Sequence, residues 1–112
     1  MDVGYLMFFD RRGHQVSRHT WLLLSAKLGY TSIADDTATD RNGSRHDVQT
    51  FWIGVGDRHH RLIFCTVVTH DQGTPAIWGW QTEHAARDGH RAIYAWITEH
   101  TAEPAGRRQW SP

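Results

Sequence analysis

His90 has the clearest capacity for chemistry in this chain. It follows Gly89 in a run that begins at Thr82, and Asp88 is close to it in sequence. An imidazole where a helix meets a sheet could serve as a ligand or as a general base. Placed histidines also occur in structural networks, where a partly buried ring hydrogen-bonds a strand carbonyl and fixes the position of the helix. We favour the structural interpretation and keep His90 as a candidate contact for a ligand or partner.

Three of the six tryptophans could form a binding surface. Trp78 and Trp80 flank Gly79, so in a strand both rings point to the same face of the sheet. Together with Trp52 they could form an aromatic platform on which a base or another ligand stacks. The alternative is that the rings form the core beneath the helices, which we expect for at least one of them. The predicted contact residues are therefore Trp52, Trp78, Trp80 and His90.

The other histidines and the single cysteine are weaker candidates. The turns at 57–60 and 70–71 combine histidine with aspartate, a pairing that suits transition metals. The apolar run 62–69 separates the two turns and places them at opposite ends of a strand, so we expect no metal site. Cys65 lies within that apolar run, which favours an inert buried thiol. No Ser-His-Asp order, phosphate-binding glycine loop or catalytic carboxylate pair has a recognisable spacing, so we expect no cofactor and no catalysis.

Composition restricts the class of protein. A chain of 112 residues makes one domain, and 12 basic against 12 acidic residues give zero net charge. Non-specific nucleic-acid binding needs a positive field, so nucleic acid is not a favoured partner. One cysteine excludes an intramolecular disulfide, and no apolar run approaches the ~20 residues of a membrane span. We expect a cytoplasmic protein of a bacterial host cell that does not contact membranes.

The elements that must position these residues can be read from the pattern of apolar residues. Ser17 and Thr82 are good N-caps for two helices, and Asn42-Gly43 is a strong hairpin signal. Gly89 lies within the second helix, where we expect it to allow close packing of the helix against the sheet. The pattern predicts strands at 5–9, 30–39, 48–55, 62–69 and 77–81, and helices at 18–28 and 83–99.

The order β-α-β-β-β-β-α predicts an α+β fold. We expect a small antiparallel sheet of four to five strands with both helices packed on one face. Residues 1–102 would form this single domain, and 103–112 would be a flexible C-terminal tail. The other sheet face would expose apolar residues such as Phe51 or Ile53, which predicts a homodimer through that face.

Five pieces of the sequence, in order, resemble a group of small uncharacterised proteins from phages, prophages and actinobacteria. The group has an opening strand that ends in Asp-x-x-Gly and a helix with an early Trp. Strands of the form V-S-T-V-W-L-G and L-I-F-E-T-M-V follow, before a closing T-x-x-x-A-x-x-G-H helix. The matching pieces of this chain are Asp10-Arg11-Arg12-Gly13, Trp21, VQTFWIG at 48–54, LIFCTVV at 62–68 and TEHAARDGH at 82–90.

The chain departs from the group at two places. Cys65 replaces the glutamate of F-E-T, so no acid-base role carries over to that position, and the turn at 57–60 replaces a proline-rich turn. The resemblance implies a fold and a phage or prophage setting, and it implies no reaction. We therefore expect a non-catalytic module that binds a host or phage macromolecule, most simply a protein. The alternative is a nucleotide or small-molecule binding domain, with or without catalytic activity, that uses the aromatic platform and His90.

Overall fold

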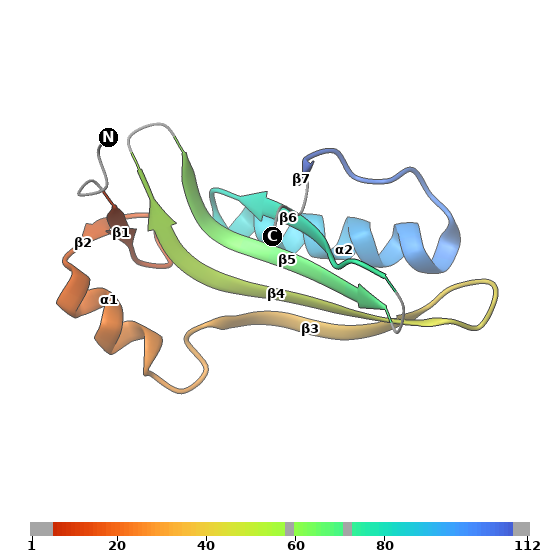
Figure 1. Ribbon diagram of the computed structural model, residues 1–112, viewed down its shortest axis with the longest axis horizontal. Coiled ribbons are helices and arrows are strands. Elements are labelled where there is room, and N and C mark those ends of the chain that lie inside the picture. The colour runs from red at the N-terminus through yellow and green to blue at the C-terminus, as the bar shows by residue number, and fades with distance from the viewer. Residues whose placement is uncertain (1–5, 58–59, 71–72, 109–112) are drawn as a thin grey trace.

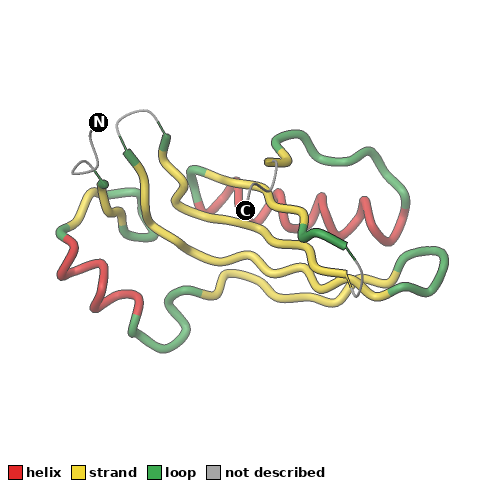
Figure 2. Tube along the Cα trace, in the orientation of Figure 1, coloured by secondary structure: helices red, strands yellow, loops and turns green. Residues whose placement is uncertain are grey.

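The computed structural model describes residues 6–57, 60–70 and 73–108, which form one sheet and two helices (Figures 1 and 2). The α+β class and the antiparallel sheet with packed helices are confirmed. The elements are β1 (Met7–Phe9), β2 (Gln15–Val16), α1 (Arg18–Ser25), β3 (Ser32–Thr39), β4 (Arg45–Gly56), β5 (Arg61–His70), β6 (Ala76–Trp80), α2 (Glu83–Glu99) and β7 (Arg107–Arg108).

The long β4–β5 hairpin is the centre of the sheet (Figure 2). The strands follow the order β2-β1-β4-β5-β6-β7, and β3 also pairs with β4. β1 pairs with the end of β4 near Gly56, and β3 pairs with the other end near Arg45, so both lie along the same edge. This long pairing surface lets one small sheet hold two helices at different places along its length.

One turn and one bulge show where the sheet requires a glycine with positive φ. Asp40 accepts hydrogen bonds at Oδ1 from the backbone N–H groups of Asn42 and Ser44, and Gly43 has a φ of 82°. The predicted Asn-Gly hairpin is therefore confirmed between β3 and β4. In β4, Gly54 has a φ of 68° at a bulge between Trp52 and Val55, and a Cβ there would collide with the carbonyl oxygen of Phe9.

Both predicted N-caps are confirmed. Ser17 Oγ accepts from the backbone of Thr20, and Thr82 Oγ1 accepts from the backbone of Ala85. α2 has the predicted bounds and packs along β3, β4, β5 and β6, whereas α1 contacts β1 near one end of the sheet (Figure 1). α1 ends at Ser25 rather than near residue 28, because the chain turns out of the helix there and carries Tyr30 back against the core.

The core lies between α2 and the sheet, in two groups of buried side chains. The group nearer α1 consists of Phe9, Ile33, Trp52, Ile63, Phe64 and Ala86. The group nearer the end of α2 consists of Ala38, Val48, Val68, Trp78, Ile93 and Ile97. A Cβ on Gly89 would meet the ring of Trp80, so the close packing expected at this glycine is confirmed.

Over the described residues the sheet has seven strands, not the four to five that the sequence predicts. The additional strands, β2 and β7, have two residues each and carry too little periodicity to be recognised. β7 lies within the segment that we predicted as a tail, where it pairs with β6. Among the described residues, neither helix is long and apolar enough to cross a membrane.

Candidate functional site

The three tryptophans predicted to form a platform lie beneath α2. Trp52 and Trp78 are buried and Trp80 is partly buried. The indole N–H of Trp52 donates to the Phe9 carbonyl at 3.1 Å, and that of Trp78 donates to the Pro104 carbonyl at 3.1 Å. The rings form core, as the alternative interpretation expected for at least one of them, and Trp52 and Trp78 offer no exposed stacking surface.

His90 joins α2 to the sheet through a chain of side-chain hydrogen bonds. Its Nε2 lies 2.7 Å from Asp36 Oδ2, and its Nδ1 lies 2.7 Å from Thr50 Oγ1. Thr50 continues to Thr66 at 2.5 Å, and the Trp80 indole N–H donates to Thr66 Oγ1 at 2.9 Å. The imidazole is only 4% exposed and bonds side chains rather than a strand carbonyl. These hydrogen bonds connect β3, β4, β5 and β6 with α2.

One arrangement of hydrogen atoms gives every side chain in this hydrogen-bond network a partner. Trp80 donates to Thr66, Thr66 donates to Thr50, and Thr50 donates to Nδ1 of a neutral His90. His90 then donates from Nε2 to the Asp36 carboxylate. No buried side-chain nitrogen or oxygen of the described residues lacks a partner, which is typical of a structural network.

The order Asp36, His90, Thr50 is that of a catalytic triad, but burial separates it from a substrate. The Thr50 and Thr66 hydroxyls lie inside the core, where no reacting group could reach them. The Asp36 end of this hydrogen-bond chain faces solvent, at a cavity of about 230 Å³ that Asp36 and His90 line together with Arg91 and Tyr94. The geometry supports the structural interpretation of His90.

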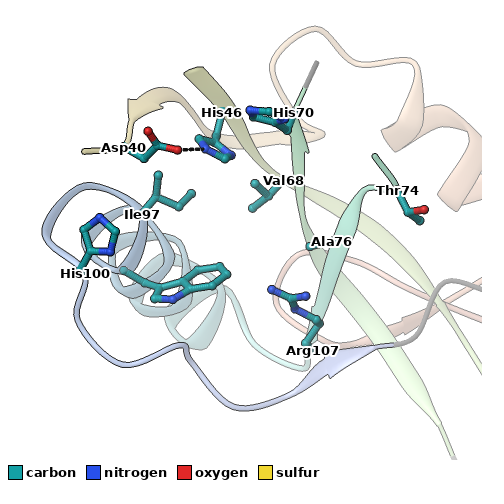
Figure 3. A pocket seen from close by; sticks show the side chains of 10 residues that line it. Asp40, His46, Val68, His70, Thr74, Ala76, Ile97, His100 and Arg107 are labelled. Carbon is teal, nitrogen blue, oxygen red and sulfur yellow. Dashed lines mark hydrogen bonds and ion pairs between the residues drawn. The ribbon is translucent and has the colours of Figure 1, made fainter. Parts of the chain in front are cut away.

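A larger cavity of about 380 Å³ opens beyond the C-terminal end of α2 (Figure 3). Side chains from both layers contribute to it, from the β3–β4 turn, from β4, β5 and β6, from the end of α2 and from β7. The lining residues are Asp40, His46, Val68, His70, Thr74, Ala76, Trp96, Ile97, His100 and Arg107.

Asp40 and His46 form a fixed pair at one wall of this cavity. The Asp40 carboxylate lies 2.9 Å from His46 Nε2. The hydrogen bond with His46, followed by the backbone bond from Ser44, holds the pKa of Asp40 below its usual value. An ionised Asp40 fixes the hydrogen of His46 on Nε2 and so sets the orientation of the ring.

Two further features give the cavity flat walls. The rings of His46 and His70 stack with centroids 4.5 Å apart, and Figure 3 shows them side by side at the rim. On the opposite side the Arg107 guanidinium lies 5.2 Å from the centre of the Trp78 ring and 5.4 Å from that of Trp96. Arg107 is held there by Glu103, whose carboxylate lies 2.5 Å from its Nε.

Sequence reasoning did not find this group. His46 and His70 are 24 positions apart in the chain and become neighbours only through the β4–β5 register. His100 and Arg107 approach them because α2 and the segment after it return to the same end of the sheet. A prediction of the β4–β5 register from the sequence could have shown that His46 lies opposite His70.

The structure also places the histidines considered as metal ligands and the cysteine considered as a nucleophile. His60 lies in the β4–β5 turn and His70 at the far end of β5, while His59 and Asp71 lie outside the described residues. Within residues 6–57, 60–70 and 73–108, no group of three or more potential ligands could hold a metal ion. Burial raises the pKa of the Cys65 thiol to about 11, which disfavours the thiolate that a nucleophile requires.

Comparisons with known proteins do not identify a relative. No protein-family model, no curated protein and no solved structure matches this chain. The resemblance to phage, prophage and actinobacterial proteins therefore stays a prediction from the sequence.

Proposed function

We propose that this protein is a small, non-catalytic binding module of phage or prophage type that contacts a protein of the host or of the phage. The observation that carries the proposal is the outer surface of α1. Leu22 is 49% exposed and Leu23 is 61% exposed, and Leu28 in the following turn is fully exposed. We call these three residues the α1 leucine surface. Adjacent exposed leucines on a short helix are typical of a contact surface.

The charge around this surface indicates the chemistry of the partner. Residues 11–34 contain four lysine or arginine residues and no acidic residue, although the whole chain has zero net charge. Arg18 precedes the leucines along the chain, and Lys27 lies between Leu23 and Leu28. A partner with an apolar centre and an acidic rim would match both features. Leucines favour a protein over a nucleic acid, because nucleic-acid surfaces are read mainly by charge and stacking.

The test is capture of a partner that depends on the leucines. The wild-type protein, the double variant Leu22→Lys/Leu23→Lys and the control Tyr94→Lys are used as bait in extract from the bacterial host. Tyr94 is an exposed apolar residue on the other helix, so its variant controls for an added charge. A captured protein is identified, purified and titrated against the three baits.

We expect the purified partner to bind wild type and Tyr94→Lys equally and to bind the leucine variant at least about tenfold more weakly. Equal binding to all three baits would reject the α1 leucine surface. Leucine-dependent binding to anionic vesicles or to nucleic acid, with no protein partner, would reject a protein partner. Turnover of a small substrate would reject the non-catalytic assignment.

The homodimer is a separate proposal, based on the sheet face that points away from α2. Phe51, Val67 and Ile77 alternate with core residues and lie half-buried on that face. A second copy would cover them. Light scattering at micromolar concentration should give twice the chain mass of 12.9 kDa, and Phe51→Lys should reduce it. A wild-type mass of one chain would reject the dimer.

A further inference from the structure

The cavity at the end of α2 exists because the helix is shorter than the sheet beside it. The 12 residues of β4 extend about 40 Å, whereas the 17 residues of α2 rise only about 25 Å. Ile97, in the last turn of α2, packs with Val48 and Val68. The next pair outward on the same face is His46 with His70, and no turn of α2 is left to cover it.

The shape of the cavity suits a planar ring. Its volume of about 380 Å³ lies within the usual range for small-molecule sites. Val68, Ala76 and Ile97 contribute apolar surface, while the imidazole pair and the Trp96 indole contribute flat faces. An aromatic ligand could replace water against these surfaces and stack on them.

The hydrogen-bonding groups of the cavity suit an anion. Among the described residues that line the cavity, Asp40 is the only one with a carboxylate. Its Oδ1 accepts two backbone N–H groups and its Oδ2 meets His46, so three of its about four acceptor sites are already used. Arg107 uses Nε for Glu103, which leaves the N–H groups at the end of its guanidinium for a ligand. His100, at the C-cap of α2, adds a ring nitrogen from the helix side (Figure 3).

We propose that this cavity binds a small molecule composed of a planar ring and one anionic group, either a carboxylate or a phosphate. The ring lies against the imidazole pair and Trp96, the anion receives hydrogen bonds from Arg107, and His100 contacts the ligand from the helix side. This site is distinct in sequence and in place from the α1 leucine surface, so it could be occupied without affecting the protein partner.

The test compares complete probes with their two halves by isothermal titration calorimetry. Indole-3-acetate and adenosine monophosphate each carry a ring and an anion. Indole and adenosine supply the ring alone, and acetate and inorganic phosphate supply the anion alone. We expect at least one complete probe to bind at least about tenfold more tightly than both of its halves, because each half lacks one set of contacts.

Arg107→Gln, His100→Gly and Arg108→Gln locate the binding. Arg108 neighbours Arg107 on β7 but pairs with Ile77 rather than Trp78, which turns its side chain to the opposite face of the sheet. It is therefore a matched control for loss of one arginine from β7. His100 has a φ of 55°, so glycine is tolerated there and this variant keeps the fold.

We expect Arg107→Gln and His100→Gly to weaken the complete probe by about tenfold or more. Arg108→Gln and Leu22→Lys/Leu23→Lys should bind it as wild type does. Binding of neither complete probe below about 10 mM would overturn the proposal. A bare anion or a bare ring that binds as tightly as the complete probe would overturn it too. Unchanged binding in both Arg107→Gln and His100→Gly would place the ligand elsewhere and refute the site.

Discussion

Replacement of Gly89 by alanine should destabilise this protein, although alanine is the better helix residue. In an exposed helix the change would add about 1 kcal/mol to the free energy of unfolding. Here the new Cβ would collide with Cζ2 and Cη2 of the Trp80 ring and lie 2.8 Å from Cε2. The ring cannot move freely, because its N–H donates to Thr66 at 2.9 Å.

The size of the effect follows from these two opposing contributions. Overpacking against a held ring costs about 1–3 kcal/mol, and displacement of the ring would also lose a hydrogen bond of about 1 kcal/mol. After the gain in helix propensity, Gly89→Ala should lower the free energy of unfolding by about 1–3 kcal/mol. Gly89→Leu should lower it further, because the longer side chain has no space between helix and sheet.

The sign of the effect should reverse when the indole is shortened. Trp80→Phe removes the ring atoms that the new Cβ would meet, so in that background Gly89→Ala should stabilise by about 1 kcal/mol. The double-mutant cycle should then give a coupling of about 2–4 kcal/mol. Urea denaturation followed by far-UV circular dichroism measures all four proteins without relying on tryptophan fluorescence. Stabilisation by Gly89→Ala in the wild-type background would show that the helix does not approach Trp80 as described.

Three further predictions concern ionisable and polar groups. His90→Ala should cost about 2–3 kcal/mol in urea denaturation, more than an exposed histidine, because it leaves the O–H of the buried Thr50 without its acceptor; a cost well below about 1 kcal/mol would contradict the network. Cys65 should react with iodoacetamide near pH 8 far more slowly in the folded protein than in urea, since its pKa is raised to about 11, and equal rates would contradict its burial. The hydrogen bond from Arg11 lowers the pKa of Glu83 in the folded protein below the ordinary value of 4.5. The ionised Glu83 carboxylate therefore stabilises the fold above pH 4.5, and this contribution is lost as the pH falls through the lower, folded-state pKa. Glu83→Gln should therefore show a shallower acid loss of stability than wild type, and an identical acid profile would contradict the ion pair.

Local features of the sequence predicted most of the regular elements. Thr82 and the apolar spacing after it placed α2 at its observed bounds. Asn42-Gly43 placed the β3–β4 hairpin, and the apolar runs placed β4 and β5 to within a few residues. These signals are local because a cap, a tight turn or a period of two depends on residues a few positions apart.

The short strands and the candidate site were beyond the reach of local signals. β7 has two residues and forms only because the chain after α2 returns to the edge of β6. The tryptophans also show what a local pattern cannot predict. The alternation of side chains along a strand placed Trp78 and Trp80 on one face of the sheet, but it did not show whether α2 or solvent covers that face. Burial of the rings became clear only when the position of the helix was known.

The sequence by itself determined the α+β class, both helix N-caps, the Asn42-Gly43 hairpin between β3 and β4, and the need for a glycine at position 89. Only the tertiary structure decided that His90 is buried in a hydrogen-bond network and that His46, His70, His100 and Arg107 share a cavity. Caps, turns and periodicity are set by interactions between near neighbours in the chain. A cavity is set by the register of strands and by the difference in length between a helix and its sheet, and both depend on residues that are far apart in sequence.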